Sequence, residues 1–168
     1  LDGLVYKLVP IKTPIDDNNP YEMGRIDSNL MYDIVKNWSW GNSERPDIYH
    51  DPETRKNSIS FRSNLSRLSN NLILEGENQK AEEIIDLAFS KMPIDFYEYY
   101  SLWTPFIEGY YKIGKRDKAI NAVEKISYKY YDRLNYFSSI EIFNQYSLAE
   151  EIISDIERYR NLIEKIEE

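Results

Sequence analysis

The strongest candidate for a metal site surrounds the single histidine of the chain. His50 stands close to Asp47, Asp51 and Glu53, and imidazole and carboxylate groups are common metal ligands. The chain has one His and no Cys, which excludes thiol catalysis, Cys-ligated zinc and His-rich metal centres. Because Asp51 comes directly before Pro52 and Glu53, we expect Asp51 to cap a helix and His50 to be solvated. The prediction is therefore no metal and no cofactor.

Adjacent carboxylates are the other groups that could do chemistry, and they occur as Asp16-Asp17, Glu82-Glu83 and Glu150-Glu151. The first pair invites comparison with the metal-binding carboxylates of nucleotide-sugar transferases, but no glycine-rich or basic phosphate site accompanies it. The other two pairs lie on predicted helices, where neighbouring side chains face different directions. We predict no catalytic residue, and a hydrolase acting through carboxylates is the least favoured hypothesis.

Tyrosine is unusually frequent, with 15 residues in 168. A buried tyrosine packs a large ring while its hydroxyl finds a polar partner, so these residues suit either a helical core or a groove for peptide or sugar. Arg62 could pair with a carboxylate of a neighbouring helix or face the same groove. The candidate binding surface consists of Tyr97, Tyr100, Tyr110, Tyr111 and Arg62.

The composition limits the partners. Twenty-one basic and 29 acidic residues give a net charge of −8, which disfavours nucleic acid and an anionic membrane surface. No apolar run approaches the roughly 18 residues of a membrane helix, so this segment is not expected to span a bilayer. The hydrophobic content of 42% is that of a folded domain. Asn37 and Asn64 match the N-glycosylation pattern, but both lie in or beside predicted helices, so we expect neither to be modified.

Residues 1–26 are predicted to be a short extended stub followed by a linker. The β-branched run from Leu4 to Ile11 favours extended chain, and TPIDDNNP has the composition of turns and connections. The chain begins with Leu1 and has no leader, so we expect it to be part of a longer protein.

Residues 27–168 are predicted to form one helical repeat domain. Apolar residues recur at helical spacing in two antiparallel hairpins, at about 52–93 and 96–131, and in a capping helix at about 147–167. The hairpins share a 38-residue offset that relates Gly76 to Gly114 and Ala81 to Ala119. Two capping boxes are expected, Asp95 with Glu98 and Ser147 with Glu150, and Pro105 predicts a kink or a helix restart.

This spacing resembles a tetratricopeptide repeat. The resemblance implies an all-α fold, a tetratricopeptide-like superhelix of stacked antiparallel helix hairpins with a short extended N-terminal segment. The second copy matches less well, because Ile126 stands where the family prefers a small residue and Tyr131 where it prefers Pro. The residues that carry the repeat signature are Leu65, Leu68, Leu72, Gly76, Ala81, Ala88, Pro93, Trp103, Gly114 and Ala119.

A narrower resemblance covers nearly the whole chain, on LDGLVYKLVPIKTP, YDIVKNWSWGN, FRSNLSRLSNNLILEGENQKAEEIIDLAFSKMP and EGYYKIGKRDKA. These segments look like the C-terminal soluble region of bacterial multispanning membrane proteins of unknown function that are related to a transmembrane protein O-mannosyltransferase. The resemblance implies that glycosyltransferase chemistry belongs to upstream membrane segments. It also implies that this region lies on the extracytoplasmic, periplasmic face of the inner membrane.

We therefore expect a noncatalytic interaction module that contacts a protein partner, an acceptor chain or the membrane domain of its own parent protein. The alternative is a substrate selector that binds a neutral glycan or a peptide with its tyrosines. The orientation of Tyr97 to Tyr111 separates the two hypotheses: buried rings favour packing, whereas exposed rings along one groove favour ligand binding.

Overall fold

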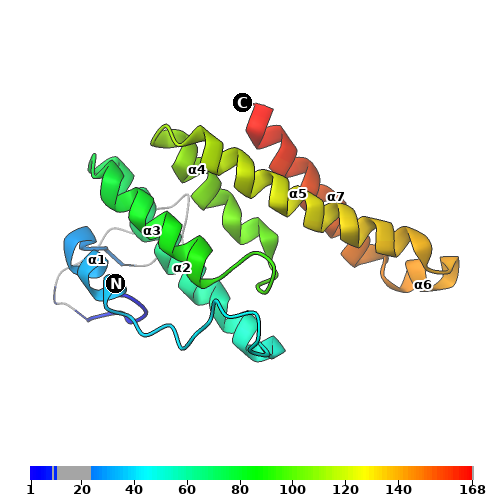
Figure 1. Cartoon of the computed structure of the whole chain (residues 1–168), viewed down its shortest axis with the longest axis horizontal. Helices are drawn as coiled ribbons and strands as arrows, with labels where there is room; N and C mark the ends of the chain where they lie inside the picture. The colour runs from blue at the N-terminus through cyan, green and yellow to red at the C-terminus, as the bar shows by residue number, and fades with distance from the viewer. Residues whose placement is uncertain (9, 11–23, 168) are drawn as a thin grey trace. The chain divides into compact units, whose positions relative to one another are not determined.

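The computed structural model describes residues 1–8, 10 and 24–167, and its described part is all-α (Figure 1). The predicted linker TPIDDNNP and the Asp16-Asp17 pair lie outside the described residues. The chain divides into two compact units, Leu1–Glu98 and Tyr99–Glu168. This division differs from the single helical domain over residues 27–168 that the sequence predicts. A tetratricopeptide-like superhelix requires the hairpins to stack, and it stays a prediction.

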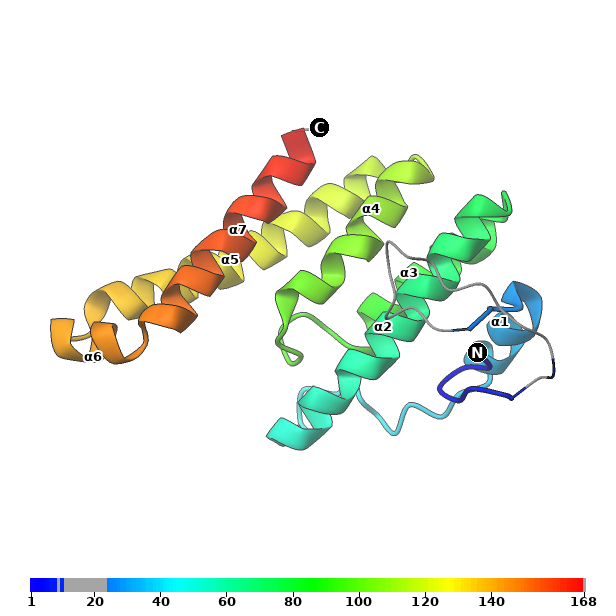
Figure 2. The same cartoon turned by 180° about the vertical axis from the view of Figure 1, so that it is seen from behind.

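The first unit contains helices α1 (Ser28–Lys36), α2 (Pro52–Leu74) and α3 (Asn78–Lys91). Figure 2 shows α2 and α3 as neighbouring helices joined by a short turn. As predicted, Asp51 caps α2: its carboxylate accepts hydrogen bonds from the backbone N–H groups of Glu53 and Thr54, and Pro52 lies in the first turn. At the other end of the pair, Pro93 follows shortly after the last residue of α3.

The turn that ends α2 is repeated, 38 residues later, after the first helix of the second hairpin. Gly76 has φ +80°, the N–H of Glu77 donates to the Leu72 carbonyl at 2.8 Å, and the N–H of Gly76 donates to the Ile73 carbonyl. In the second unit Gly114 has φ +75°, and Lys115 and Gly114 donate to the corresponding carbonyls. A residue with left-handed backbone conformation, together with this pair of hydrogen bonds, is the Schellman motif at a helix C-terminus. The motif favours glycine because glycine has no Cβ. The sequence offset thus corresponds to a repeated local structure.

Two small residues of α3 lie in the buried core, where this helix packs against α2. Ala81 and Ala88 are fully buried on α3, two turns apart on one helix face. An Ala81→Leu substitution should overpack this contact and lower the free energy of unfolding by about 1 to 3 kcal/mol. A lower urea midpoint with an unchanged slope would show this, and Ser90→Leu, at an exposed position of the same helix, is the control. Equal midpoints for wild type and Ala81→Leu would contradict the prediction.

Polar contacts attach α1 to the hairpin. Tyr32 and Lys36 both donate hydrogen bonds to the Glu83 carboxylate of α3, and Ser28 donates to Glu75 at 2.9 Å. These bonds, first that of Tyr32 and then that of Lys36, lower the pKa of Glu83 from its ordinary value of 4.5.

A pH dependence follows from this lowered pKa. Because the folded state favours ionised Glu83, the stabilisation is present above the unfolded pKa and is lost as the pH falls through the folded pKa. The difference in unfolding free energy between wild type and Glu83→Gln should therefore be larger at pH 7 than at pH 3.5. Urea unfolding at the two pH values measures it, and a pH-independent difference would contradict this assignment.

The second unit contains a 3-10 helix, η1 (Tyr100–Trp103), and helices α4 (Thr104–Lys112), α5 (Arg116–Ser139), α6 (Ile142–Ser147) and α7 (Ala149–Glu167). Helix α5 packs against both α4 and α7. Arg133 of α5 donates to Glu151 and to the buried carboxylate of Asp155 on α7, each at 2.7 Å. These charge-assisted bonds give the buried Asp155 carboxylate a cationic partner, without which its burial would be strongly unfavourable.

Two predicted helix boundaries and one predicted capping box in this unit are wrong. The helix expected from residue 96 begins at Thr104, because Glu98 is bonded to Arg55 and Tyr99 has a left-handed φ of 60°. Pro105 lies in the first turn of α4, so its predicted restart is confirmed. Helix α5 continues to Ser139 instead of ending near residue 131, where Tyr131 stands at the position of Pro93 in the first copy and does not interrupt the helix. Ser147 ends α6 instead of capping α7.

Candidate functional site

A cavity of about 180 Å³ lies in the first unit, between the start of α2, the loop that precedes it and the chain that follows α3. Its wall combines aromatic rings with hydroxyl and amide groups. The lining residues are Ser39, Trp40, Ser43, Thr54, Asn57, Ser58, Phe61, Met92 and Tyr97. None of these side chains is charged at neutral pH, and burial raises the pKa of Tyr97 further above its ordinary value. The cavity is therefore a neutral, mixed polar and apolar site.

The aromatic part of the wall is held by ring packing. The ring centroids of Trp38, Trp40 and Phe61 lie 5.4 to 5.7 Å apart in edge-on or tilted arrangements. Each ring contacts the other two, and such aromatic pairs are favourable beyond the area that they bury. Trp40 and Phe61 are thus positioned by the protein whether or not a ligand is present.

Most polar groups of the wall already serve the fold. Ser43 donates to the Lys91 carbonyl at 2.6 Å, Thr54 donates to the Asp51 carboxylate at 2.6 Å, and the Tyr97 hydroxyl donates to the Ser43 carbonyl at 3.1 Å. These bonds connect the loop before α2 to the helix hairpin and thereby shape the cavity.

Three other polar groups of the wall are uncommitted. Ser39, Asn57 and the Trp40 indole N–H make no hydrogen bond to any residue that the structure describes. Asn57 can donate and accept, the Ser39 hydroxyl can do both, and the Trp40 indole can only donate. These three groups are available to a ligand.

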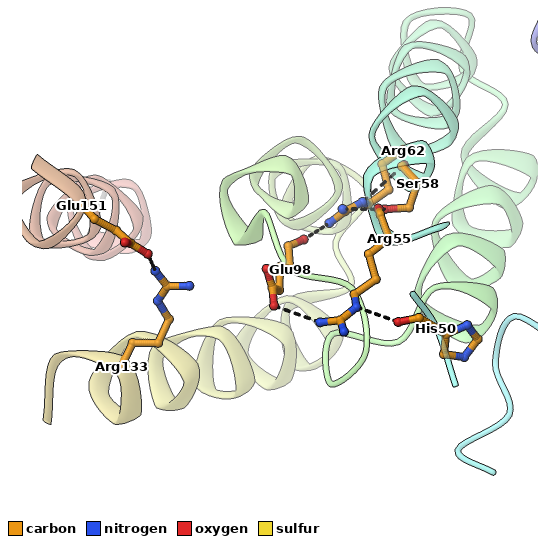
Figure 3. Close-up of polar contacts among 7 residues, drawn as sticks. All are labelled: His50, Arg55, Ser58, Arg62, Glu98, Arg133 and Glu151. Carbon is orange, nitrogen blue, oxygen red and sulfur yellow. Dashed lines mark hydrogen bonds and ion pairs between the residues drawn. The ribbon is translucent and has the colours of Figure 1, made fainter. Parts of the chain in front are cut away.

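Arg62 lies beside this cavity but does not line it. Its guanidinium, only 1% exposed, donates to the Ser58 hydroxyl and to the Glu98 carbonyl, each at 2.8 Å (Figure 3). Arg55, one helical turn before Ser58, pairs with the Glu98 carboxylate at 3.1 Å and donates to the His50 carbonyl at 2.9 Å. Two arginines of α2 thus bind Glu98, and the Arg62 side chain is buried inside the fold instead of being part of an exposed binding surface.

His50 lies at a second, shallower hollow of about 470 Å³. Its ring stacks on Phe96 at a centroid distance of 5.7 Å and also contacts Tyr97. The neighbouring Asp51 is committed to capping α2. Within the described part of the chain, no group of three or more His, Asp or Glu side chains is placed to hold a metal ion.

The predicted tyrosine surface is divided between the two units. Tyr97, which belongs to the first unit, is 2% exposed and lines the cavity. Tyr110 of α4 is also buried, at 3%, while Tyr100 and Tyr111 are partly exposed. Tyr100 packs edge-on against Tyr130, whose pKa burial raises to about 12. Because buried rings favour packing over ligand binding, Tyr97 and Tyr110 are better explained as packing residues.

Several large apolar side chains of the second unit that were not predicted as a binding surface are strongly exposed. Tyr136 at the end of α5 and three residues of α6 are 61 to 81% exposed. We call this set the aromatic patch: Tyr136, Ile142, Phe143 and Tyr146. Helix α6 has no buried residue at all. The three large apolar residues of IFNQYS were the available signal for this surface, but a six-residue helix is too short for a clear periodic pattern.

Comparison of the chain with models of protein families, with curated proteins and with solved structures found no match. The resemblances described above therefore stay hypotheses. The structure by itself defines the class of the described residues, which is an all-α protein with helix hairpins. In the described residues, no helix has the combination of length and hydropathy needed to cross a bilayer.

Proposed function

We propose that this chain is a noncatalytic, extracytoplasmic interaction module of a membrane glycosyltransferase-like protein, and that it contacts a protein partner through the aromatic patch. The observation that carries the contact is the exposure of four large apolar side chains within eleven residues, 81% in the case of Phe143. Large apolar side chains that are exposed close together in the sequence are candidates for a surface that contacts a protein or a membrane. The link to a glycosyltransferase and the periplasmic location are supported by the sequence resemblance alone.

The construction of α6 supports this proposal. Short helices are unstable in water by themselves, and in proteins their stability comes mainly from burying an apolar face. Helix α6 buries no residue; it contacts α7, and Gln145 donates a side-chain hydrogen bond to the Ile140 carbonyl at 2.9 Å. A partner that covers Ile142, Phe143 and Tyr146 would provide the missing burial.

The charges around the patch favour a basic protein over a bilayer. Residues 131–153 carry four carboxylates, Asp132, Glu141, Glu150 and Glu151, and one guanidinium, Arg133, which pairs with Glu151, so this stretch has an excess of negative charge. Acidic groups repel anionic lipid headgroups and attract Lys and Arg on a partner. The partner is therefore expected to present an apolar contact surrounded by basic side chains.

Site-specific photo-crosslinking in the native host tests this proposal. A photoreactive phenylalanine analogue at position 143 of the full-length gene product should give an adduct with a second protein, and Ile142→Asp should remove that adduct. The matched control is the same analogue at Tyr49, which is 79% exposed in the first unit and should give no such adduct. Adducts with lipid only, with another copy of the chain only, or equally from both positions would overturn the proposal.

The noncatalytic part of the proposal has its own test. The purified chain should show no glycoside hydrolysis and no sugar transfer above background. Turnover that disappears when a single carboxylate is replaced by its amide would show that the chain is an enzyme. The extracytoplasmic location is tested separately, by fusing a periplasm-dependent reporter enzyme to the end of the full-length protein.

A further inference from the structure

We infer that the cavity of the first unit binds one neutral pyranose ring of a saccharide. This site lies in a different unit from the aromatic patch, so the inference is independent of the proposed protein contact. It rests on the size of the cavity, on the lack of charge in its wall and on the distribution of aromatic and uncommitted polar groups.

The volume fits one ring-sized group. A cavity of about 150 Å³ lined by apolar side chains accommodates benzene, and this cavity measures about 180 Å³. A complete drug-sized ligand generally needs about 300 Å³ or more. The cavity therefore accepts a single six-membered ring of a ligand, with the remainder of that ligand in solvent.

The wall excludes charged ligands. A carboxylate or phosphate would be desolvated against Trp40, Phe61 and Met92 without a cationic side chain in the lining, and an ammonium group would lack a lining carboxylate. The nearest buried cation, Arg62, already donates to Ser58 and to Glu98. A neutral ring is the remaining class.

The wall also distinguishes a pyranose from an apolar ring. A pyranose has C–H faces that pack on aromatic rings and a perimeter of hydroxyl groups that both donate and accept hydrogen bonds. Trp40 and Phe61 supply the aromatic surface, and Ser39, Asn57 and the Trp40 indole supply uncommitted hydrogen-bonding groups. An apolar side chain such as that of phenylalanine would dehydrate these polar groups without replacing their hydrogen bonds.

Nuclear magnetic resonance of the purified 168-residue chain tests the inference, with a panel of methyl pyranosides of gluco, galacto, manno and N-acetylglucosamine configuration as probes. At least one should produce saturable shifts of the Trp40 indole N–H and of the Asn57 side-chain amide. A dissociation constant on the order of millimolar is expected, because the ligand is small. Trp40→Phe assigns the indole resonance among the three tryptophans.

Two exposed polar substitutions then test the contacts. Asn57→Ala and Ser39→Ala lie at exposed positions and should leave folding intact, while each weakens binding by about 3-fold to 10-fold, the range expected for one lost hydrogen bond. Asn70→Ala, an exposed change of the same kind on the same helix, is the matched control and should bind like wild type.

Other outcomes overturn the inference. If no pyranoside gives saturable shifts at tenfold the expected dissociation constant, the cavity is not a saccharide site. If benzyl alcohol binds there more tightly than every pyranoside and Asn57→Ala has no effect, the cavity is a pocket for an apolar side chain. Equal weakening by Asn57→Ala and Asn70→Ala would place the binding elsewhere on α2.

Discussion

Replacing Trp103 with alanine is expected to lower the free energy of unfolding by about 3 to 5 kcal/mol, the largest effect among the changes considered. Trp103 ends η1, is fully buried and packs against Phe106 of α4 at a centroid distance of 5.5 Å. Removing the indole takes a large apolar surface out of the core and leaves a cavity that the rigid helices close only in part. Chemical denaturation followed by far-ultraviolet circular dichroism measures the loss.

The control for this prediction is Phe143→Ala in the same unit. Phe143 is 81% exposed, so its truncation should change the free energy of unfolding by no more than about 0.5 kcal/mol. Trp103→Phe should lie between the two, since it keeps an aromatic ring in the core. If Trp103→Ala and Phe143→Ala have equal effects, Trp103 is not a core residue of this protein.

Helix boundaries could be predicted from sequence where a single local interaction decides them. Asp51 and Pro52 start α2, and a glycine with positive φ ends both α2 and α4. These signals depend on backbone groups within one turn of the residue, so no distant contact is needed to interpret them. The same reasoning explains why the all-α class could be inferred without knowledge of how the hairpins pack.

The boundaries that were predicted wrongly depend on tertiary contacts. Asp95 and Glu98 have capping-box spacing, but Glu98 pairs with Arg55, which lies 43 residues earlier in the chain. Asp155 looks like part of a solvated helix face, yet it is 3% exposed because Arg133 of α5 approaches it. A long-range ion pair cannot be seen in local spacing, and in the first of these cases the Glu98 carboxylate pairs with Arg55.

The candidate site shows the same limit. The high number of tyrosines led to the prediction of Tyr97, Tyr100, Tyr110 and Tyr111 as binding residues, and of these four only Tyr97 lines the cavity. The groups available to a ligand, Ser39, Trp40 and Asn57, belong to the loop before α2 and to α2 itself. None of these residue types indicates a binding site by itself. The cavity between them forms only because the segment after α3, with Met92 and Tyr97, packs against the loop and α2.

Arg62 provides the second large expected effect. It is the most deeply buried charged side chain in the described residues, at 1% exposure, and it joins α2 to the backbone at Glu98. Truncation to alanine removes its hydrogen bonds to Ser58 and Glu98 and leaves a cavity. We expect Arg62→Ala to lower the free energy of unfolding by about 2 to 4 kcal/mol, as the sum of lost hydrogen bonding and lost packing.

A second variant separates charge from shape. Arg62→Met keeps much of the side-chain volume but removes the guanidinium, and replacing a buried charged group with an apolar one of similar volume is often well tolerated. If Arg62 acts mainly by filling space, Arg62→Met should recover most of the stability lost in Arg62→Ala. If its hydrogen bonds are the main contribution, Arg62→Met should recover only the smaller, packing part of that loss, and the backbone amides after Tyr97 should exchange hydrogen faster in both variants, because Glu98 has lost one of its two arginine contacts. We expect the hydrogen bonds to be the main contribution. Arg62 donates to the backbone carbonyl of Glu98, and no helix holds the chain between Lys91 and Tyr100. If Arg62→Ala is as stable as wild type, both explanations, space filling and hydrogen bonding, are contradicted. The buried guanidinium then contributes no net stability.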